Sequence, residues 1–184
     1  VSVEWGRNAE DNWTFRRFRL PRPKKIAGQT LVLASTGGNT YFHWVTDVLP
    51  RIRLARQAGY DPGSFDHFLV NGTDQSFQKE TLAHFGIPES HCLGLPGPEA
   101  AYECLLLGRP GVVPPETVEF LRSEFAGFAS GKTKRIFIGR AGARHRALVH
   151  EEVLSRKLAE KGFENLACEN LSLREQAKAL ASAD

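Results

Sequence analysis

Apolar runs alternate with amphipathic segments along most of this chain. "QTLVLAS" (29–35) is a continuous apolar run typical of a buried strand, and residues 39–57 after its Gly-Gly turn follow the 3.6-residue period of a helix. The alternation continues, with further strands predicted at 66–72, 90–97, 101–111, 135–142 and 163–170 and helices at 75–86, 114–128, 150–162 and 172–184. This order predicts an α/β fold with parallel sheets.

Two segments interrupt the pattern. The first 21 residues alternate aromatic and polar residues around turn formers, which predicts a hairpin of exposed strands. "ASGKTK" (129–134) is small, polar and basic, as linkers are. We therefore expect an N-terminal α/β domain at 1–128, a linker at 129–134 and the incomplete start of a second α/β domain at 135–184. Because the chain starts without Met and stops inside an apparent helix, we expect a fragment of a longer protein.

Composition narrows the class of protein. The chain has 184 residues, 41% of them apolar, and a net charge of +3 with both signs interspersed, so a nucleic-acid partner is not expected. No apolar run approaches the roughly 18 residues of a membrane span, and no signal peptide is visible, which predicts a cytoplasmic protein without a transmembrane segment. The three cysteines lack metal-ligand spacing and predict small buried thiols in a reducing compartment.

The predicted helix at 39–57 carries an unusual polar face. His43, Asp47 and Arg51 follow one another at four-residue intervals, and Pro50 interrupts the helix between Asp47 and Arg51. Pro50 removes one backbone hydrogen bond and is expected to bend the helix. The helix starts at the carboxyl edge of the sheet, where α/β folds bind ligands. The imidazole and carboxylate could accept a proton from a hydroxyl group there or hold one in place. An ordinary His-Asp pair with Arg51 reaching solvent is the alternative.

A second polar cluster lies in the basic turn into which the predicted strand at 135–142 runs. In "RIFIGRAGARHR" three arginines, Arg140, Arg144 and Arg146, crowd one turn whose glycines would let backbone amides approach an anion. Guanidinium groups match phosphate oxygens, which favours a pyrophosphate or nucleotide site. A solvated basic loop is the alternative. No Asp-x-Asp motif offers carboxylates for a nucleotide-bound metal ion, so we expect no metal site and no cofactor.

Two stretches together resemble glycosyltransferase family 61. "YFHWVTDVLPRI" is similar to the family signature of Tyr or Phe before His-Trp, then Asp, then Leu-Pro-Arg. The segment from "RIFIGRAGARHR" to the closing "ASAD" is similar to its second segment, a strand, an arginine-rich turn and a helix with an acidic start, followed by Leu-Ser-Leu-x-Glu-Gln. The chain departs from the family in having His150 where Asn often precedes the helix-starting Glu. The resemblance covers residues 30–184.

This resemblance implies a GT-B architecture of two Rossmann-like domains and an inverting, metal-independent transfer of a sugar from a nucleotide-sugar donor to a glycan or other hydroxyl acceptor. It implies that Asp47, or His43 oriented by it, deprotonates the acceptor, and that the three arginines hold the donor diphosphate. We also expect Asn39, Trp44 and Arg51 to bind substrate.

Related glycosyltransferases continue beyond Ala-Asp with a strand and a glycine-rich His-Gly-Ala donor segment, so we expect the chain to be truncated before it. An incomplete second sheet would have an open edge, through which a homo-oligomer could form. The expected pathway is synthesis of a bacterial surface or capsular polysaccharide. The alternative is a non-catalytic sugar- or nucleotide-binding module, or an inactive fragment of such an enzyme.

Overall fold

The computed structural model describes residues 10, 18–19, 25–94, 113–128, 131, 134–143 and 147–183. The chain forms two compact units, residues 1–120 and 121–184. The domain bounds predicted from the sequence, with a linker at 129–134, stay a prediction. The predicted hairpin at 1–21, the predicted strand at 101–111 and most of that linker lie outside the described residues.

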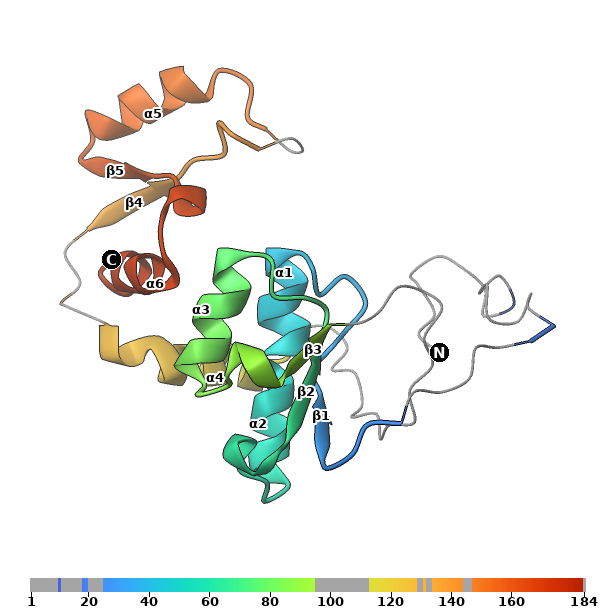
Figure 1. Cartoon of the computed structure of the whole chain (residues 1–184). Coiled ribbons are helices and arrows are strands. Elements are labelled where there is room, and N and C mark those ends of the chain that lie inside the picture. Colours follow the sequence, from blue (N-terminus) through green and yellow to red (C-terminus); the bar gives the residue numbers. More distant parts are fainter. Residues whose placement is uncertain are drawn as a thin grey trace. The chain divides into compact units, whose positions relative to one another are not determined.

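The sheet of the first unit has, among the described residues, three parallel strands in the order β1-β2-β3 (Figure 1). They are β1 (Thr30–Val32), β2 (His67–Val70) and β3 (Cys92–Gly94). Leu31 pairs with Phe68, which pairs in turn with Cys92. The parallel pairing predicted from the strand-helix alternation is therefore confirmed for these strands.

One helical segment leads away from β1, and its middle turn is of the π type. It consists of α1 (Tyr41–His43), the π-helical η3 (Trp44–Val48) and α2 (Pro50–Gln57). In η3 the Leu49 N–H donates to the Trp44 carbonyl at 3.0 Å, one residue further back than in an α-helix. Pro50, which has no N–H, occupies the first position of α2. The wide turn thus accommodates the proline inside the segment.

The core of the first unit lies between this helical segment, the sheet and α3 (Ser76–His84). Trp44 is fully buried, and its indole N–H donates to the Thr81 hydroxyl of α3 at 2.8 Å. The other buried apolar side chains come mainly from β1, β2 and the helical segment 41–57, among them Leu31, Leu33, Val48, Leu49, Ile52, Phe68, Leu69, Val70 and Leu82. Short 3-10 turns, η4 (Pro62–Ser64) and η5 (Glu89–His91), precede β2 and β3.

The second unit repeats the strand-helix order on a smaller scale. Helix α4 (Pro115–Phe125) contains the division between the units and continues into η6 (Ala126–Phe128). There follow β4 (Arg135–Ile138), α5 (Glu151–Ala159), β5 (Phe163–Leu166), η7 (Cys168–Asn170) and α6 (Leu173–Ala181). β4 and β5 are parallel, and Lys134 forms a further parallel bridge with Ala183.

Helix α6 begins with a capping box. Ser172 Oγ accepts from the Glu175 N–H at 3.3 Å, and the Glu175 carboxylate accepts from the Ser172 N–H at 2.9 Å. Hydrogen bonds from the Ser172 side chain and backbone lower the pKa of Glu175. The cap therefore supports the helix above the ordinary carboxyl pKa and is lost as the pH falls through the lowered one.

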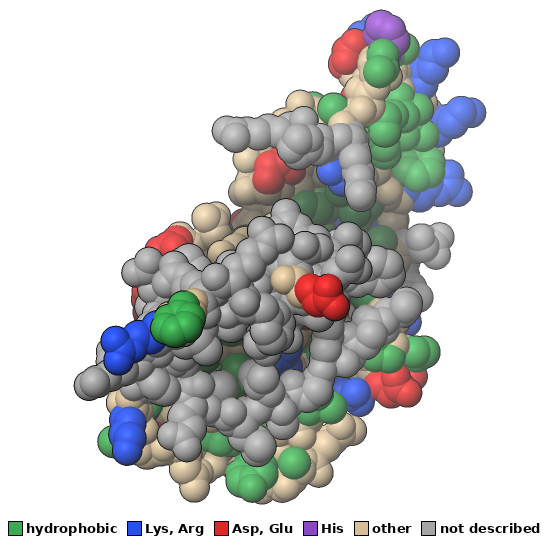
Figure 2. All heavy atoms as spheres, turned by 90° about the vertical axis from the view of Figure 1, so that its right-hand side faces the viewer, with side chains coloured by type: hydrophobic (Ala, Val, Ile, Leu, Met, Phe, Trp, Pro, Cys, Tyr) green, Lys and Arg blue, Asp and Glu red, His purple; other side chains and the backbone are tan. Residues whose placement is uncertain are grey.

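Several large apolar side chains of the second unit remain exposed. Figure 2 shows hydrophobic side chains next to Lys and Arg in the upper part of the view, where this unit lies. The exposed positions lie on β4, α6 and the approach to and first turn of α5, namely Ile138, Leu148, Val149, Val153, Leu154 and Leu180. A homo-oligomer through an open sheet edge stays a prediction.

Replacing Trp44 by Phe tests the central contact of the first unit. Trp44→Phe removes the hydrogen bond to Thr81 and part of a fully buried ring, so we expect the free energy of unfolding to fall by about 2 kcal/mol. Urea unfolding measures this loss, with the exposed Tyr60→Phe as a control that stays near wild type. Equal stability of Trp44→Phe and wild type contradicts the packing described.

Candidate functional site

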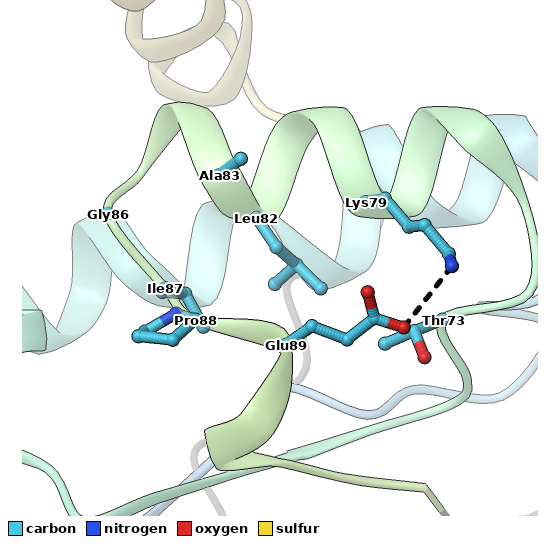
Figure 3. Close-up of a pocket in the computed structure, with 8 residues that line it drawn as sticks. All are labelled: Thr73, Lys79, Leu82, Ala83, Gly86, Ile87, Pro88 and Glu89. Carbon is cyan, nitrogen blue, oxygen red and sulfur yellow. Dashed lines mark ion pairs between the residues drawn. The ribbon is translucent and has the colours of Figure 1, made fainter.

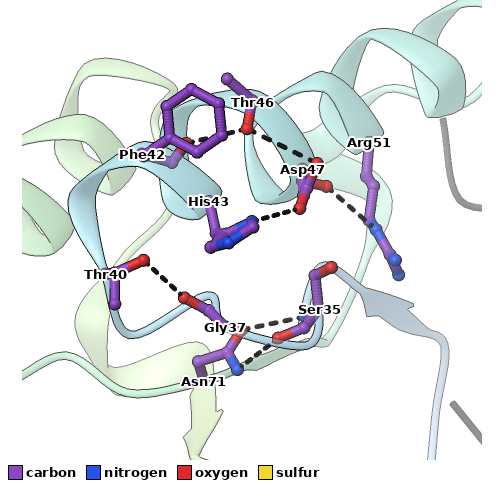
Figure 4. Close-up of polar contacts among 9 residues, drawn as sticks. All are labelled: Ser35, Gly37, Thr40, Phe42, His43, Thr46, Asp47, Arg51 and Asn71. Atoms are coloured by element: carbon purple, nitrogen blue, oxygen red, sulfur yellow. Dashed lines mark hydrogen bonds and ion pairs between the residues drawn. The ribbon is translucent and has the colours of Figure 1, made fainter. Parts of the chain in front are cut away.

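His43 and Asp47 form a pair on the helical segment that follows β1. His43 Nδ1 lies 2.9 Å from Asp47 Oδ2 (Figure 4). The Asp47 side chain is 7% exposed and the His43 side chain 39% exposed. Because a carboxylate only accepts hydrogen bonds, this contact places the ring proton on Nδ1 and leaves Nε2 as the acceptor. The arrangement is a half-exposed imidazole held by a buried carboxylate.

The surroundings of Asp47 fix its carboxylate in place. Its Oδ1 lies 3.5 Å from the Thr46 hydroxyl, which donates to the Phe42 carbonyl at 2.8 Å. A buried carboxylate requires such partners, because an uncompensated charge in a protein interior is costly. The imidazole is therefore the more exposed member of the pair, and the carboxylate is the buried one.

Arg51 is buried and contacts the backbone of Asp47. It is 5% exposed, its Nε donates to the Asp47 carbonyl at 3.2 Å, and its Nη1 lies 3.5 Å from the Val32 carbonyl at the end of β1. The alternative in which Arg51 reaches solvent is therefore wrong. The guanidinium instead joins the helix to the strand, because burial requires its donors to find backbone acceptors.

The glycines after β1 allow the turn to approach the site closely. Gly37 has a φ of +79°, and a Cβ there would lie 2.8 Å from Cδ2 of the His43 ring. A Cβ on Gly38 would overlap the side-chain amide of Asn71. The turn 35–40 is thus packed between the imidazole and the end of β2, with no space for a side chain on either glycine.

Asn71 is a site residue that the sequence reasoning missed. Its Oδ1 accepts from the Ser35 N–H at 2.9 Å, and its Nδ2 donates to the Ser35 carbonyl at 2.7 Å (Figure 4). The amide therefore fixes the turn after β1 from the end of β2. The available signal was its place directly after a buried strand, at the edge where parallel strands end together.

Asn39 and Trp44, which were also predicted to bind substrate, differ in exposure. Asn39 is exposed on the turn before α1. Trp44 is fully buried against α3 and contributes to the core. For both, and for Arg51, a contact with substrate stays a prediction.

The arginine cluster of the second unit is described in part. Arg140 is exposed in the turn after β4, whereas Arg144 and Arg146 lie outside the described residues. The Gly139 N–H donates to the Leu166 carbonyl at 3.1 Å, the Arg140 N–H to Glu151 Oε1 at 2.6 Å and the Ala143 N–H to the Arg140 carbonyl at 2.9 Å. These three amides therefore bind the protein itself and do not point to an anion.

The cysteine thiols are weak candidates for nucleophilic chemistry. Burial and the nearby Glu89 raise the pKa of the Cys92 thiol to about 11, and burial and Glu169 raise the pKa of Cys168. Both thiols are half-buried, so the expectation of buried thiols is too strong for these two, and the third, Cys104, lies outside the described residues. A raised pKa makes both described thiols poor nucleophiles at neutral pH.

The described residues contain a pocket away from the predicted site and no metal-binding cluster. A pocket of about 360 Å³ lies between α3 and residues 86–89, next to the Lys79–Glu89 ion pair at 3.3 Å (Figure 3). None of its lining residues belongs to the predicted site. Within the described ranges, no group of three or more His, Cys, Asp or Glu could hold a metal ion. In the same part of the chain, no helix combines the length and the apolarity needed to cross a membrane.

Comparison with known proteins gives one match. The family model described as Glycosyltransferase 61 matches residues 41–184, which include the His43–Asp47 pair and the turn at Arg140. No curated protein and no solved structure matches the chain.

Asn71 offers a test of how the turn is fixed. Asn71→Asp keeps an acceptor for the Ser35 N–H but loses the donor to the Ser35 carbonyl and places a negative charge against it. We expect the free energy of unfolding to fall by about 1–2 kcal/mol in urea titrations. The exposed Asp74→Asn is the control and stays near wild type. If both variants unfold like wild type, Asn71 does not hold the turn.

Proposed function

Because the chain belongs to the glycosyltransferase 61 family, we propose that it carries an inverting glycosyltransferase site that moves a sugar from a nucleotide-sugar donor to a hydroxyl acceptor. The observation that carries this proposal is the contact of 2.9 Å between a half-exposed imidazole and a buried carboxylate. That arrangement suits a general base at the carboxyl edge of a parallel sheet.

The proposed reaction is a single displacement. His43 Nε2 accepts the proton of the acceptor hydroxyl while the hydroxyl oxygen attacks the anomeric carbon of the donor sugar. The bond from that carbon to the diphosphate oxygen breaks, and its electron pair leaves with the nucleoside diphosphate. Because attack and departure take place on opposite faces, the anomeric configuration inverts. The proton remains on the imidazole until solvent removes it.

Asp47 acts in this proposal through His43. Its carboxylate accepts from Nδ1, so in the neutral imidazole the free lone pair is on Nε2, and the same carboxylate stabilises the imidazolium that forms. The burial of Asp47 supports this division of roles, because a hydroxyl acceptor reaches the exposed ring more readily than a carboxylate that is 7% exposed. Arg51 holds the backbone carbonyl of Asp47 and is a positioning residue.

The second unit carries the donor side of the proposal. Arg140 follows the carboxyl end of β4 and is exposed, so its guanidinium can bind the diphosphate as negative charge develops on the leaving oxygen. Arg144 and Arg146 are proposed partners in this role. The positive charge of the arginines would stabilise the leaving diphosphate, as a metal ion does in other transferases. The two units would be the Rossmann-like halves of a GT-B enzyme.

The acceptor side is proposed to bind a glycan. Tyr41 and Phe42 immediately precede His43 and are 43% and 61% exposed. The Tyr41 ring meets Phe77 edge-on at 5.3 Å, and the Phe42 ring meets the His43 ring edge-on at 5.4 Å. Exposed aromatic faces beside the proposed base suit the C–H surface of a sugar. A surface polysaccharide made in the cytoplasm of a bacterium is the proposed product.

Substitution of the pair tests the proposed base. We expect His43→Ala to lower the rate of sugar transfer at least about a hundredfold, because the proton acceptor is gone, and Asp47→Asn to lower it strongly through the wrong ring tautomer. Transfer is measured as nucleotide release in the natural full-length protein, with the exposed His91→Ala and Asp74→Asn as controls. Transfer within a few-fold of wild type in His43→Ala refutes the assignment of His43 as the base.

Binding of nucleoside diphosphates tests the donor side. Arg140→Ala is expected to weaken binding of UDP or GDP about tenfold in calorimetry, because a charged hydrogen bond to phosphate is lost. The matched control is Arg156→Ala, an exposed arginine in the last turn of α5. Equal weakening by both variants indicates a general charge effect and contradicts a specific site at Arg140.

A further inference from the structure

The first residue of α5 has a buried carboxylate that is only half satisfied. Glu151 is 5% exposed, and its Oε1 accepts from the Arg140 N–H at 2.6 Å. Its Oε2 is also buried and has no hydrogen-bond partner among the described residues. Acidic residues are common at helix starts, but they are usually exposed or paired at both oxygens. An unpartnered acceptor of this kind is costly and requires a reason.

The backbone around Glu151 positions its carboxylate next to the turn at 139–143. A Cβ on Gly139 would lie 2.7 Å from Glu151 Oε1 and 2.8 Å from Oδ1 of Asn165 on β5, so a side chain there would displace both groups. His150, the residue before α5, has a φ of 59° in the left-handed region. Non-glycine residues adopt that conformation at a cost, and here it directs the chain so that Glu151 enters the interior.

The position of the free oxygen identifies the kind of group that it can bind. Glu151 contacts the backbone of Arg140, the residue proposed to hold the donor diphosphate. A carboxylate repels phosphate, so the part of a nucleotide sugar that can approach Oε2 is a hydrogen-bond donor and not the diphosphate itself. In a nucleotide sugar the hydroxyl groups next to the diphosphate belong to the ribose on one side and to the transferred sugar on the other.

We propose that Glu151 Oε2 accepts a hydrogen bond from a hydroxyl group of the nucleotide sugar. Arg140 then binds the phosphate, and Glu151 binds the adjoining sugar ring, which enters between the turn at 139–143 and the first turn of α5. This inference rests on the proposed function of the Arg140 turn. It adds a residue that distinguishes nucleotide sugars from other phosphorylated ligands.

The test compares two neighbouring glutamates of the same helix turn. Glu151→Gln keeps an oxygen for the Arg140 N–H and removes the charged acceptor, whereas Glu152→Gln makes the same change of charge at an exposed position. Calorimetry uses whichever of UDP and GDP the wild type binds, its 2′-deoxy and 3′-deoxy forms, and the corresponding nucleotide sugar. We expect Glu151→Gln to bind the nucleotide sugar about tenfold or more weakly, and Glu152→Gln to bind it like wild type.

The deoxy forms locate the hydroxyl. If it belongs to the ribose, the wild type binds one deoxy form weakly and Glu151→Gln loses that discrimination. If it belongs to the transferred sugar, Glu151→Gln weakens only the nucleotide sugar. Equal affinities of wild type and Glu151→Gln for every probe, with thermal unfolding showing both folded, overturn the inference while leaving the donor site intact. Failure of the wild type to bind any probe overturns the donor site itself, and the inference with it.

Discussion

The first unit depends on a proline that lies within a helix. Pro50 cannot donate to a carbonyl in the preceding turn, and the chain responds with a π-helical turn closed by the Leu49 N–H on the Trp44 carbonyl. The extra residue in this turn shifts everything after it by about 100° around the helix axis. Arg51, which follows this turn, is buried, as is Asp47 within it, while His43 before the turn stays half-exposed. Exposure along the segment therefore changes at the π-helical turn.

The two units stabilise their turns by the same physical device. In each, a glycine at the carboxyl end of a strand leaves space for a polar side chain that binds turn backbone: Asn71 binds Ser35 near Gly38, and Glu151 binds Arg140 near Gly139. The two side chains differ in whether both of their polar atoms have hydrogen-bond partners. The Asn71 amide uses one acceptor and one donor on Ser35, whereas Glu151 keeps a buried oxygen without a partner. The first turn is thus internally satisfied, and the second retains an unused acceptor.

The elements of the fold were predicted well because they depend on local periodicity. The buried run at 29–35 became β1, and the helix predicted at 172–184 became α6 with its capping box. Strand ends were predicted less well: β1 is shorter than the apolar run at 29–35, because pairing with a neighbour and not hydrophobicity decides where a strand stops. The resemblance to glycosyltransferase family 61 is confirmed by the family match over residues 41–184.

The sequence by itself determined the order of elements, the parallel α/β character and the pairing of His43 with Asp47, because four-residue spacing brings two side chains together on any helix. Only the tertiary structure decided which member of the pair faces outward, that Arg51 turns inward to the Val32 carbonyl, and that Asn71 and Glu151 bind the backbone of the turns after β1 and β4. These outcomes depend on contacts between residues from 11 to 36 positions apart. Burial and backbone hydrogen bonding across such separations are properties of packing, and local spacing carries no information about them.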